Sequence, residues 1–168
     1  MSIAINLVSP AENQFLGDLE KRANRPNHFF RAMANRPDVL KNFVPFYGAI
    51  MGPGSVDRRT KELVYLTVSY TNQCAYCTAA HKASAKKAGV TDEEIQAIET
   101  EQYQNFSAAD RAAIQYAREL TESASAVETG DALFRYFNDE QIVEITLVTA
   151  MANFTNRFNN GLRVQPEQ

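Results

Sequence analysis

The chain has 168 residues, enough for one domain with a sizeable core but not for two independent enzymes. Its 17 Lys and Arg residues against 20 Asp and Glu give a net charge of -3, with no basic run, which argues against nucleic acid and anionic membrane surfaces as partners. The composition, 45% hydrophobic and without low-complexity stretches, is that of an ordinary globular protein, so we expect one domain over residues 1–168.

Targeting signals and membrane spans are not evident in the sequence. No window approaches the roughly 20 apolar residues that cross a bilayer, and residues 1–6 lack the charged-then-apolar layout of a signal peptide. We therefore expect a cytoplasmic protein. In a reducing cytoplasm, two cysteines only three positions apart indicate redox cycling or metal binding rather than a permanent disulfide.

Prolines punctuate the first third of the chain. Pro26, Pro37, Pro45 and Pro53 predict several short helices joined by turns, and residues 52–55 are the clearest loop.

Residues 63–70 are rich in β-branched and aromatic side chains, which by propensity favour a buried strand. We predict a helix instead, because a shift of 79 positions aligns residues 63–68 with residues 142–147, in a stretch that has a helical pattern. The shift points to a degenerate repeat with chemistry kept in one copy. It superposes the first-copy residues Cys74, Cys77 and His81 on Asn153, Asn156 and Asn160.

The rest of the chain carries helix signals. Gly89 ends a helix predicted over residues 74–88, and a capping box at Thr91 opens the next one. Ser107 begins a further helix, and Asn138 begins the last, predicted over residues 139–162. The fold class predicted is therefore all-α.

Cys74, Cys77 and His81 are separated by three and four residues, so one face of one helix carries all three. Residues 71–73 are candidate capping residues that put the thiols in the opening turn, where the helix dipole favours a thiolate. A thiolate can attack a peroxide oxygen, and a second cysteine within reach can condense with the resulting sulfenic acid. His81 can exchange protons near neutral pH, and Glu62 could orient it. Which cysteine has the lower pKa stays open.

Other interpretations of the same residues are less favoured. Zinc needs four ligands, but beyond Cys74, Cys77 and His81 the only other histidine is His28 and no second cysteine pair exists. The pair could also be two inert buried thiols. Tyr76, Phe46 and Tyr47 are candidate pocket residues, although aromatic side chains more often pack in a core or at a subunit contact.

The pattern Glu62, eleven residues, Cys74-x-x-Cys77, three residues, His81 resembles the alkyl hydroperoxidase D-like branch of the carboxymuconolactone decarboxylase family. The resemblance covers residues 37–125, and the closing helix at 139–162 is similar to that of many members. It implies an all-α fold assembled into trimers or hexamers, with no cofactor. The implied activity is reduction of a small hydroperoxide, recharged by a dithiol or by a lipoyl-bearing protein.

Carried over to this chain, the resemblance implies that Cys77 is the peroxidatic thiol, Cys74 the resolving thiol, and His81 with Glu62 the proton relay. The best-known members have a second histidine where this chain has Tyr76, which implies a shorter relay. Two rival hypotheses remain: a disulfide reductase or thiol redox sensor that uses the same pair, and a non-catalytic oligomeric binding protein.

Overall fold

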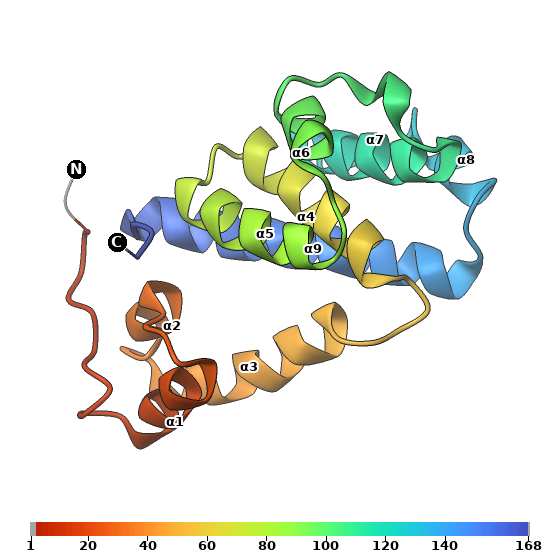
Figure 1. Cartoon of the computed structure of the whole chain (residues 1–168). Coiled ribbons are helices and arrows are strands. Elements are labelled where there is room, and N and C mark those ends of the chain that lie inside the picture. Colours follow the sequence, from red (N-terminus) through yellow and green to blue (C-terminus); the bar gives the residue numbers. More distant parts are fainter. Residues whose placement is uncertain (1–2, 168) are drawn as a thin grey trace.

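Residues 3–167 are described by the structure, a computed structural model, and within them the chain is helical with no strand (Figure 1). The predicted all-α fold is confirmed. None of the helices described has the length and apolar character to cross a bilayer. In chain order the elements are α1 (Gln14–Ala23), α2 (His28–Met33), α3 (Pro37–Met51), α4 (Arg58–Thr71), α5 (Ala75–Lys87), α6 (Asp92–Glu99), the 3-10 turn η1 (Tyr103–Asn105), α7 (Ala108–Ser123), α8 (Gly130–Phe134) and α9 (Asp139–Leu162).

Helix α4 lies at the centre of the fold, packed against α5, α6, α7 and α9. Every residue from 60 to 69 is buried, because neighbours cover the helix on all sides. This explains its strand-like composition: a helix buried all round loses the polar face that marks an amphipathic helix. The helix predicted over residues 63–70 is confirmed.

The helix ends follow the capping signals in the sequence. Thr91 and Asn138 form complete capping boxes at the starts of α6 and α9, and the Ser107 hydroxyl caps α7. Gly89, with φ +89°, follows the end of α5 in the left-handed region that favours glycine.

The N-terminal helices form a separate layer beside the α4–α9 body (Figure 1). Pro37 occupies the first turn of α3, where its missing N–H is tolerated. Pro45 does not separate two helices as predicted but lies inside α3, on its exposed side, where water can satisfy the carbonyl that loses its partner.

Candidate active site

The turn between α4 and α5 sets the position of Cys74. Gln73 adopts φ +52°, and the Cys74 N–H donates to the Ser69 carbonyl at 2.9 Å, so the chain reverses and α5 begins. The helix cap is Cys74 itself rather than residues 71–73, because its Sγ accepts the Cys77 N–H at 3.3 Å. Both cysteines therefore lie in the first turn of α5, as predicted.

The two sulfur atoms lie 2.7 Å apart and are almost fully buried, with Cys74 1% and Cys77 3% exposed. Cys74 donates its S–H to the Cys77 sulfur. This hydrogen bond is the main reason that the pKa of Cys77 is lowered; burial opposes the shift, and contacts from Asn159, Asn156 and Thr155 add to it. The same bond and burial raise the pKa of Cys74. Cys77 is therefore the cysteine with the lower pKa.

Asparagines of α9 support the cysteine turn from the opposite side. Asn159 Nδ2 donates to Cys77 Sγ at 3.3 Å. The Asn72 side-chain amide donates to Asn153 and Asn156, and the Asn72 carbonyl accepts from Asn160 at 2.9 Å. The three asparagines that the 79-residue shift aligns with the cysteines and His81 thus hold the turn that precedes them.

Glu62 and His81 form a buried pair beside the cysteines. Glu62 is 0% exposed, and its Oε2 lies 2.7 Å from His81 Nδ1. Its other oxygen lies 2.5 Å from a guanidinium nitrogen of Arg58, at an angle outside hydrogen-bonding range. We assign Nδ1–H as the donor to this carboxylate, which leaves Nε2 directed at the Tyr47 hydroxyl.

Two tyrosines complete this pair. The Tyr47 hydroxyl lies 3.3 Å from His81 Nε2, and burial, with the charge of Glu62, raises the pKa of Tyr47, so that hydroxyl keeps its proton. The Tyr65 ring stacks on the His81 imidazole at 3.5 Å between centroids. A continuous path of hydrogen-bonding groups therefore runs from Glu62 through His81 to Tyr47.

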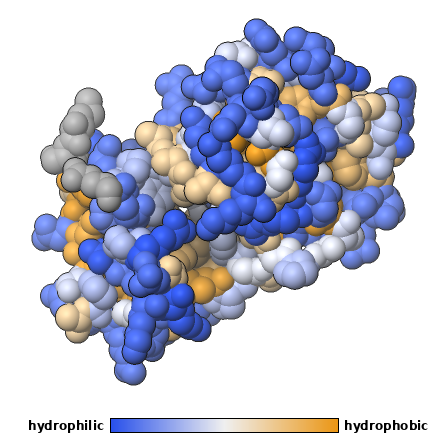
Figure 2. Space-filling view, in the orientation of Figure 1, coloured by the Kyte–Doolittle hydropathy of each residue, from blue (hydrophilic) through white to orange (hydrophobic). Residues whose placement is uncertain are grey.

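A cavity of about 590 Å³ opens onto these groups. Figure 2 shows apolar surface in the hollow between the N-terminal layer and the α4–α9 body. Cys77, His81, Tyr47 and Tyr76 line the cavity, but Cys74 is not among its lining residues. Phe46 lies outside it: its side chain is 56% exposed, one position from Tyr47 and on the outer face of α3. The other lining side chains include Phe29, Phe30, Phe43, Arg58, Tyr65, Thr155 and Asn159.

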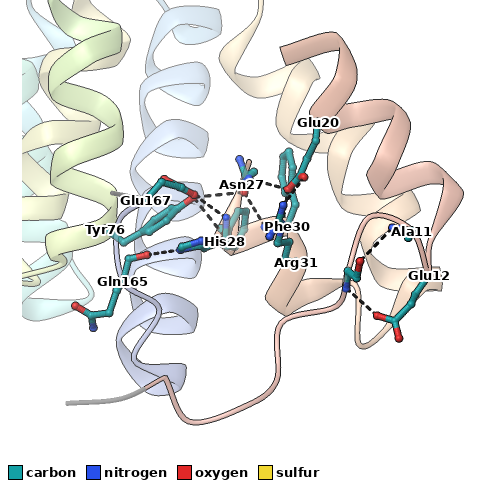
Figure 3. Close-up of polar contacts among 12 residues, drawn as sticks. Ala11, Glu12, Glu20, Asn27, His28, Phe30, Arg31, Tyr76, Gln165 and Glu167 are labelled. Carbon is teal, nitrogen blue, oxygen red and sulfur yellow. Dashed lines mark hydrogen bonds and ion pairs between the residues drawn. The ribbon is translucent and has the colours of Figure 1, made fainter. Parts of the chain in front are cut away.

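Residues of the C-terminal segment line one side of the cavity, and Figure 3 shows their contacts with Tyr76 and with the start of α2. Glu167 Oε1 accepts the His28 backbone N–H at 2.6 Å and the Tyr76 hydroxyl at 2.9 Å. A ring nitrogen of His28 lies 3.0 Å from the Gln165 carbonyl oxygen. Tyr76 therefore points away from the Glu62–His81 pair, and Tyr47 extends that pair into the cavity.

Metal-binding geometry is not found in the described part of the chain, where no group of three or more His, Cys, Asp or Glu side chains converges. The groups gathered at the cavity are instead a thiol pair, a carboxylate–imidazole pair and phenol hydroxyls. That set can move protons and exchange electrons through sulfur.

Known proteins share this sequence and fold. The profile of the carboxymuconolactone decarboxylase family matches residues 37–119, a segment from the start of α3 into α7 that includes Glu62, both cysteines and His81. This chain belongs to the carboxymuconolactone decarboxylase family. A relative, YdfG of Bacillus subtilis (strain 168), is 28% identical over 109 residues, which are 62% of this chain and 74% of YdfG.

Solved structures of this fold cover nearly the whole chain. A peroxidase-related protein with an alkylhydroperoxidase AhpD core from Ralstonia eutropha JMP134 superposes with a TM-score of 0.87 at 22% identity, over 99% of this chain and 93% of that one. The debrominase Bmp8, solved as a cysteine-to-alanine variant with 2,3,4-tribromopyrrole, superposes with a TM-score of 0.83 at 21% identity, over 99% and 93%. These likenesses establish the AhpD-like fold.

Sequence reasoning missed four residues of the site. Asn159 and Thr155 reach it from α9, far from residues 74–81 in sequence, and Tyr65 reaches it from the preceding helix α4. A contact across helices leaves no local pattern. Arg58 lies four residues before Glu62, a spacing typical of a helical ion pair, and that signal could have identified it.

Proposed function

We propose that this protein reduces small organic hydroperoxides with the Cys74–Cys77 dithiol, in an AhpD-like thiol peroxidase cycle. The observation that carries the proposal is the position of Cys77. Its sulfur has a lowered pKa, contacts Cys74, and lines a cavity that also contains His81 and Tyr47.

The proposed peroxidase cycle needs only these side chains, the peroxide and an external dithiol. The Cys77 thiolate attacks one peroxide oxygen, the O–O bond breaks, and the departing alkoxide takes a proton from Tyr47. The proton that Cys77 released on ionising returns to Tyr47 through His81, which Glu62 orients. The Cys77 sulfenic acid then condenses with the Cys74 thiol, forming a disulfide and water. An external dithiol reduces that disulfide and becomes a disulfide itself.

Access to the site favours a slender reductant. Both sulfurs are buried, and Cys77 is reached only through the cavity, so the surface of a folded protein disulfide cannot approach them. A small dithiol or a lipoyl group on an extended arm can enter. This supports the peroxidase hypothesis over a protein disulfide reductase.

A second candidate activity is reductive debromination of an aromatic ring. It is favoured by the aromatic cavity wall, which includes Phe29, Phe30, Phe43 and Tyr65, and by the similarity of fold to Bmp8. The same dithiol would supply two electrons, giving the dehalogenated ring, bromide, a proton and the Cys74–Cys77 disulfide.

The test is steady-state turnover of cumene hydroperoxide and, separately, of 2,3,4-tribromopyrrole with dihydrolipoamide. We expect peroxide turnover that Cys77→Ser lowers by more than about a thousandfold. Without dihydrolipoamide, Cys74→Ser should react once with the peroxide and stop at a sulfenic acid, detected by mass spectrometry. If only the bromopyrrole is turned over, debromination replaces peroxide reduction as the proposed activity. If both thiols stay free after exposure to either substrate, the protein is a binding protein rather than an enzyme of this kind.

A further inference from the structure

The longest helix in the described residues, α9, carries an apolar stripe on its solvent side. Val143, Leu147, Ala150 and Phe154 are exposed, Val143 to 58%, Leu147 to 41% and Phe154 to 49%. Their spacing of four, three and four residues is that of the seam between two packed helices. The solvent-facing side of a helix is seldom apolar at every seam position. This stripe is therefore typical of a contact surface.

The charges at the two ends of the stripe are complementary. Glu140 lies in the first turn of α9, one turn before Val143, and Arg157 lies one turn after Phe154. Both are exposed, and neither forms an ion pair within residues 3–167. Arg157 contacts only Asn153 on its own helix.

These positions are symmetric about the midpoint between Val148 and Thr149. If a second α9 packs antiparallel across a two-fold axis at that midpoint, Val143 faces Phe154 and Leu147 faces Ala150. The same register brings Glu140 of each copy to Arg157 of the other. A large residue faces a smaller one at each apolar pair, and opposite charges meet at both ends.

We propose that α9 is a two-fold interface between two copies of this chain, paired antiparallel in this register. A two-fold interface pairs a surface with a second copy of itself, so that surface must be self-complementary. The stripe and its terminal charges meet this condition, and binding to a chemically different partner would not require it. A contact of this kind gives a dimer on its own and is also one of the contacts that builds a hexamer.

The interface extends onto α3, as its area requires. The α9 stripe from Glu140 to Arg157 is about 26 Å long, and at a helix width of about 10 Å it covers about 260 Å². A stable interface buries roughly 800 Å² on each partner, so the stripe alone is too small. Helix α3 packs beside α9, and its Phe43 ring stacks on Phe154 at 5.7 Å between centroids. The exposed Val39 and Phe46 of α3 continue the apolar surface. This accounts for the outward position of Phe46.

The experiment is sedimentation equilibrium of the full chain at physiological salt. We expect wild-type self-association through a two-fold contact. Leu147→Glu should weaken it at least about a hundredfold, because it places a carboxylate near the axis in both copies. Glu140→Arg and Arg157→Glu should each weaken it about tenfold, since each variant opposes like charges at both ends.

The decisive variant is the double exchange Glu140→Arg with Arg157→Glu, which restores opposite charges across the axis. Association should return to within about threefold of wild type. Circular dichroism confirms that each variant is folded, as expected for substitutions at exposed positions. A monomeric wild-type chain, an assembly insensitive to Leu147→Glu, or a double exchange no tighter than the single ones would overturn the proposal.

Discussion

The contact between Asn159 and Cys77 adds to the lowering of the Cys77 pKa. Asn159 is 2% exposed, its Nδ2 donates to the Cys77 sulfur, and its Oδ1 has no hydrogen-bond partner among residues 3–167. A buried acceptor beside the reactive sulfur is available to the O–H of a hydroperoxide, which would align the substrate with the thiolate.

Replacing Asn159 should raise the pKa of Cys77. Asn159→Leu removes the N–H donor at similar volume, and Asn159→Asp places a carboxylate against the sulfur, so the second shift should be larger. Because the ordinary pKa of a thiol is about 8.5 and that of Cys77 lies lower, thiolate absorbance at 240 nm should develop at higher pH in both variants. Asn42→Leu, on the outer face of α3, is the control, and equal titration curves for all four proteins would contradict this role.

At the scale of elements, a buried ion pair fixes the loop between α3 and α4. Lys61, 1% exposed, donates to the Ile50 and Gly52 carbonyls and pairs with Glu144 of α9. Glu144 also accepts the Ser55 and Val56 N–H groups. A methyl group at Gly54 would overlap the Glu144 carboxylate, which explains a glycine there. This loop directs α4, and with it Glu62, into the core.

Breaking that pair should destabilise the fold. Lys61→Met leaves the Glu144 carboxylate without its cation, and we expect a loss of about 2–4 kcal/mol in the free energy of unfolding by urea. Lys82→Met, which removes a surface pair with Glu99 at 3.9 Å, should cost less than about 1 kcal/mol. Similar losses of unfolding free energy in the two variants would show that the buried Lys61–Glu144 pair stabilises the fold no more than a surface ion pair.

The pair also gives stability a pH dependence. Burial raises the pKa of Glu144, but hydrogen bonds from Lys61 and Ser55 outweigh it, and the net pKa lies below the ordinary value of 4.5. A carboxyl group with a lowered folded-state pKa stabilises the fold above its unfolded pKa and loses that contribution as pH falls. The difference in the free energy of unfolding between wild type and Lys61→Met should therefore become smaller below about pH 4.5.

At the scale of the whole molecule, the segments near the two ends of the chain both contact distant helices, and the C-terminal one lines the cavity. The Ala4 N–H donates to the Leu162 carbonyl, and residues 165–167 bind the start of α2. The cavity therefore has walls from the N-terminal layer, from α5 and from the C-terminal segment. Access to Cys77 depends on contacts between distant parts of the sequence.

Loosening the C-terminal segment should expose Cys77. Glu167→Ala removes the contacts with His28 and Tyr76, hydrogen bonds to a charged group worth roughly 1–3 kcal/mol, so a bulky maleimide should alkylate Cys77 several-fold faster. Gln165→Ala is the matched control, because Gln165 contacts His28 through its backbone carbonyl, which the substitution keeps. Equal alkylation rates in the two variants would mean that the segment does not control access.

The sequence alone determined the local features of this protein. Helix ends at Thr91, Ser107 and Asn138 follow from hydrogen bonds between neighbouring residues, and the spacing of Cys74, Cys77 and His81 on one helix follows from its period. Helix caps and helical spacing depend on residues only a few positions apart, so the sequence alone is enough to predict them.

Tertiary structure decided what depends on contacts across helices. It lowered the pKa of Cys77, through the hydrogen bonds from Cys74 and Asn159, and it turned Tyr76 toward Glu167 and Tyr47 toward His81. It also left Pro45 inside α3. Burial, side-chain direction and the electric field at a sulfur are set by residues distant in sequence, and only the folded chain brings those residues together.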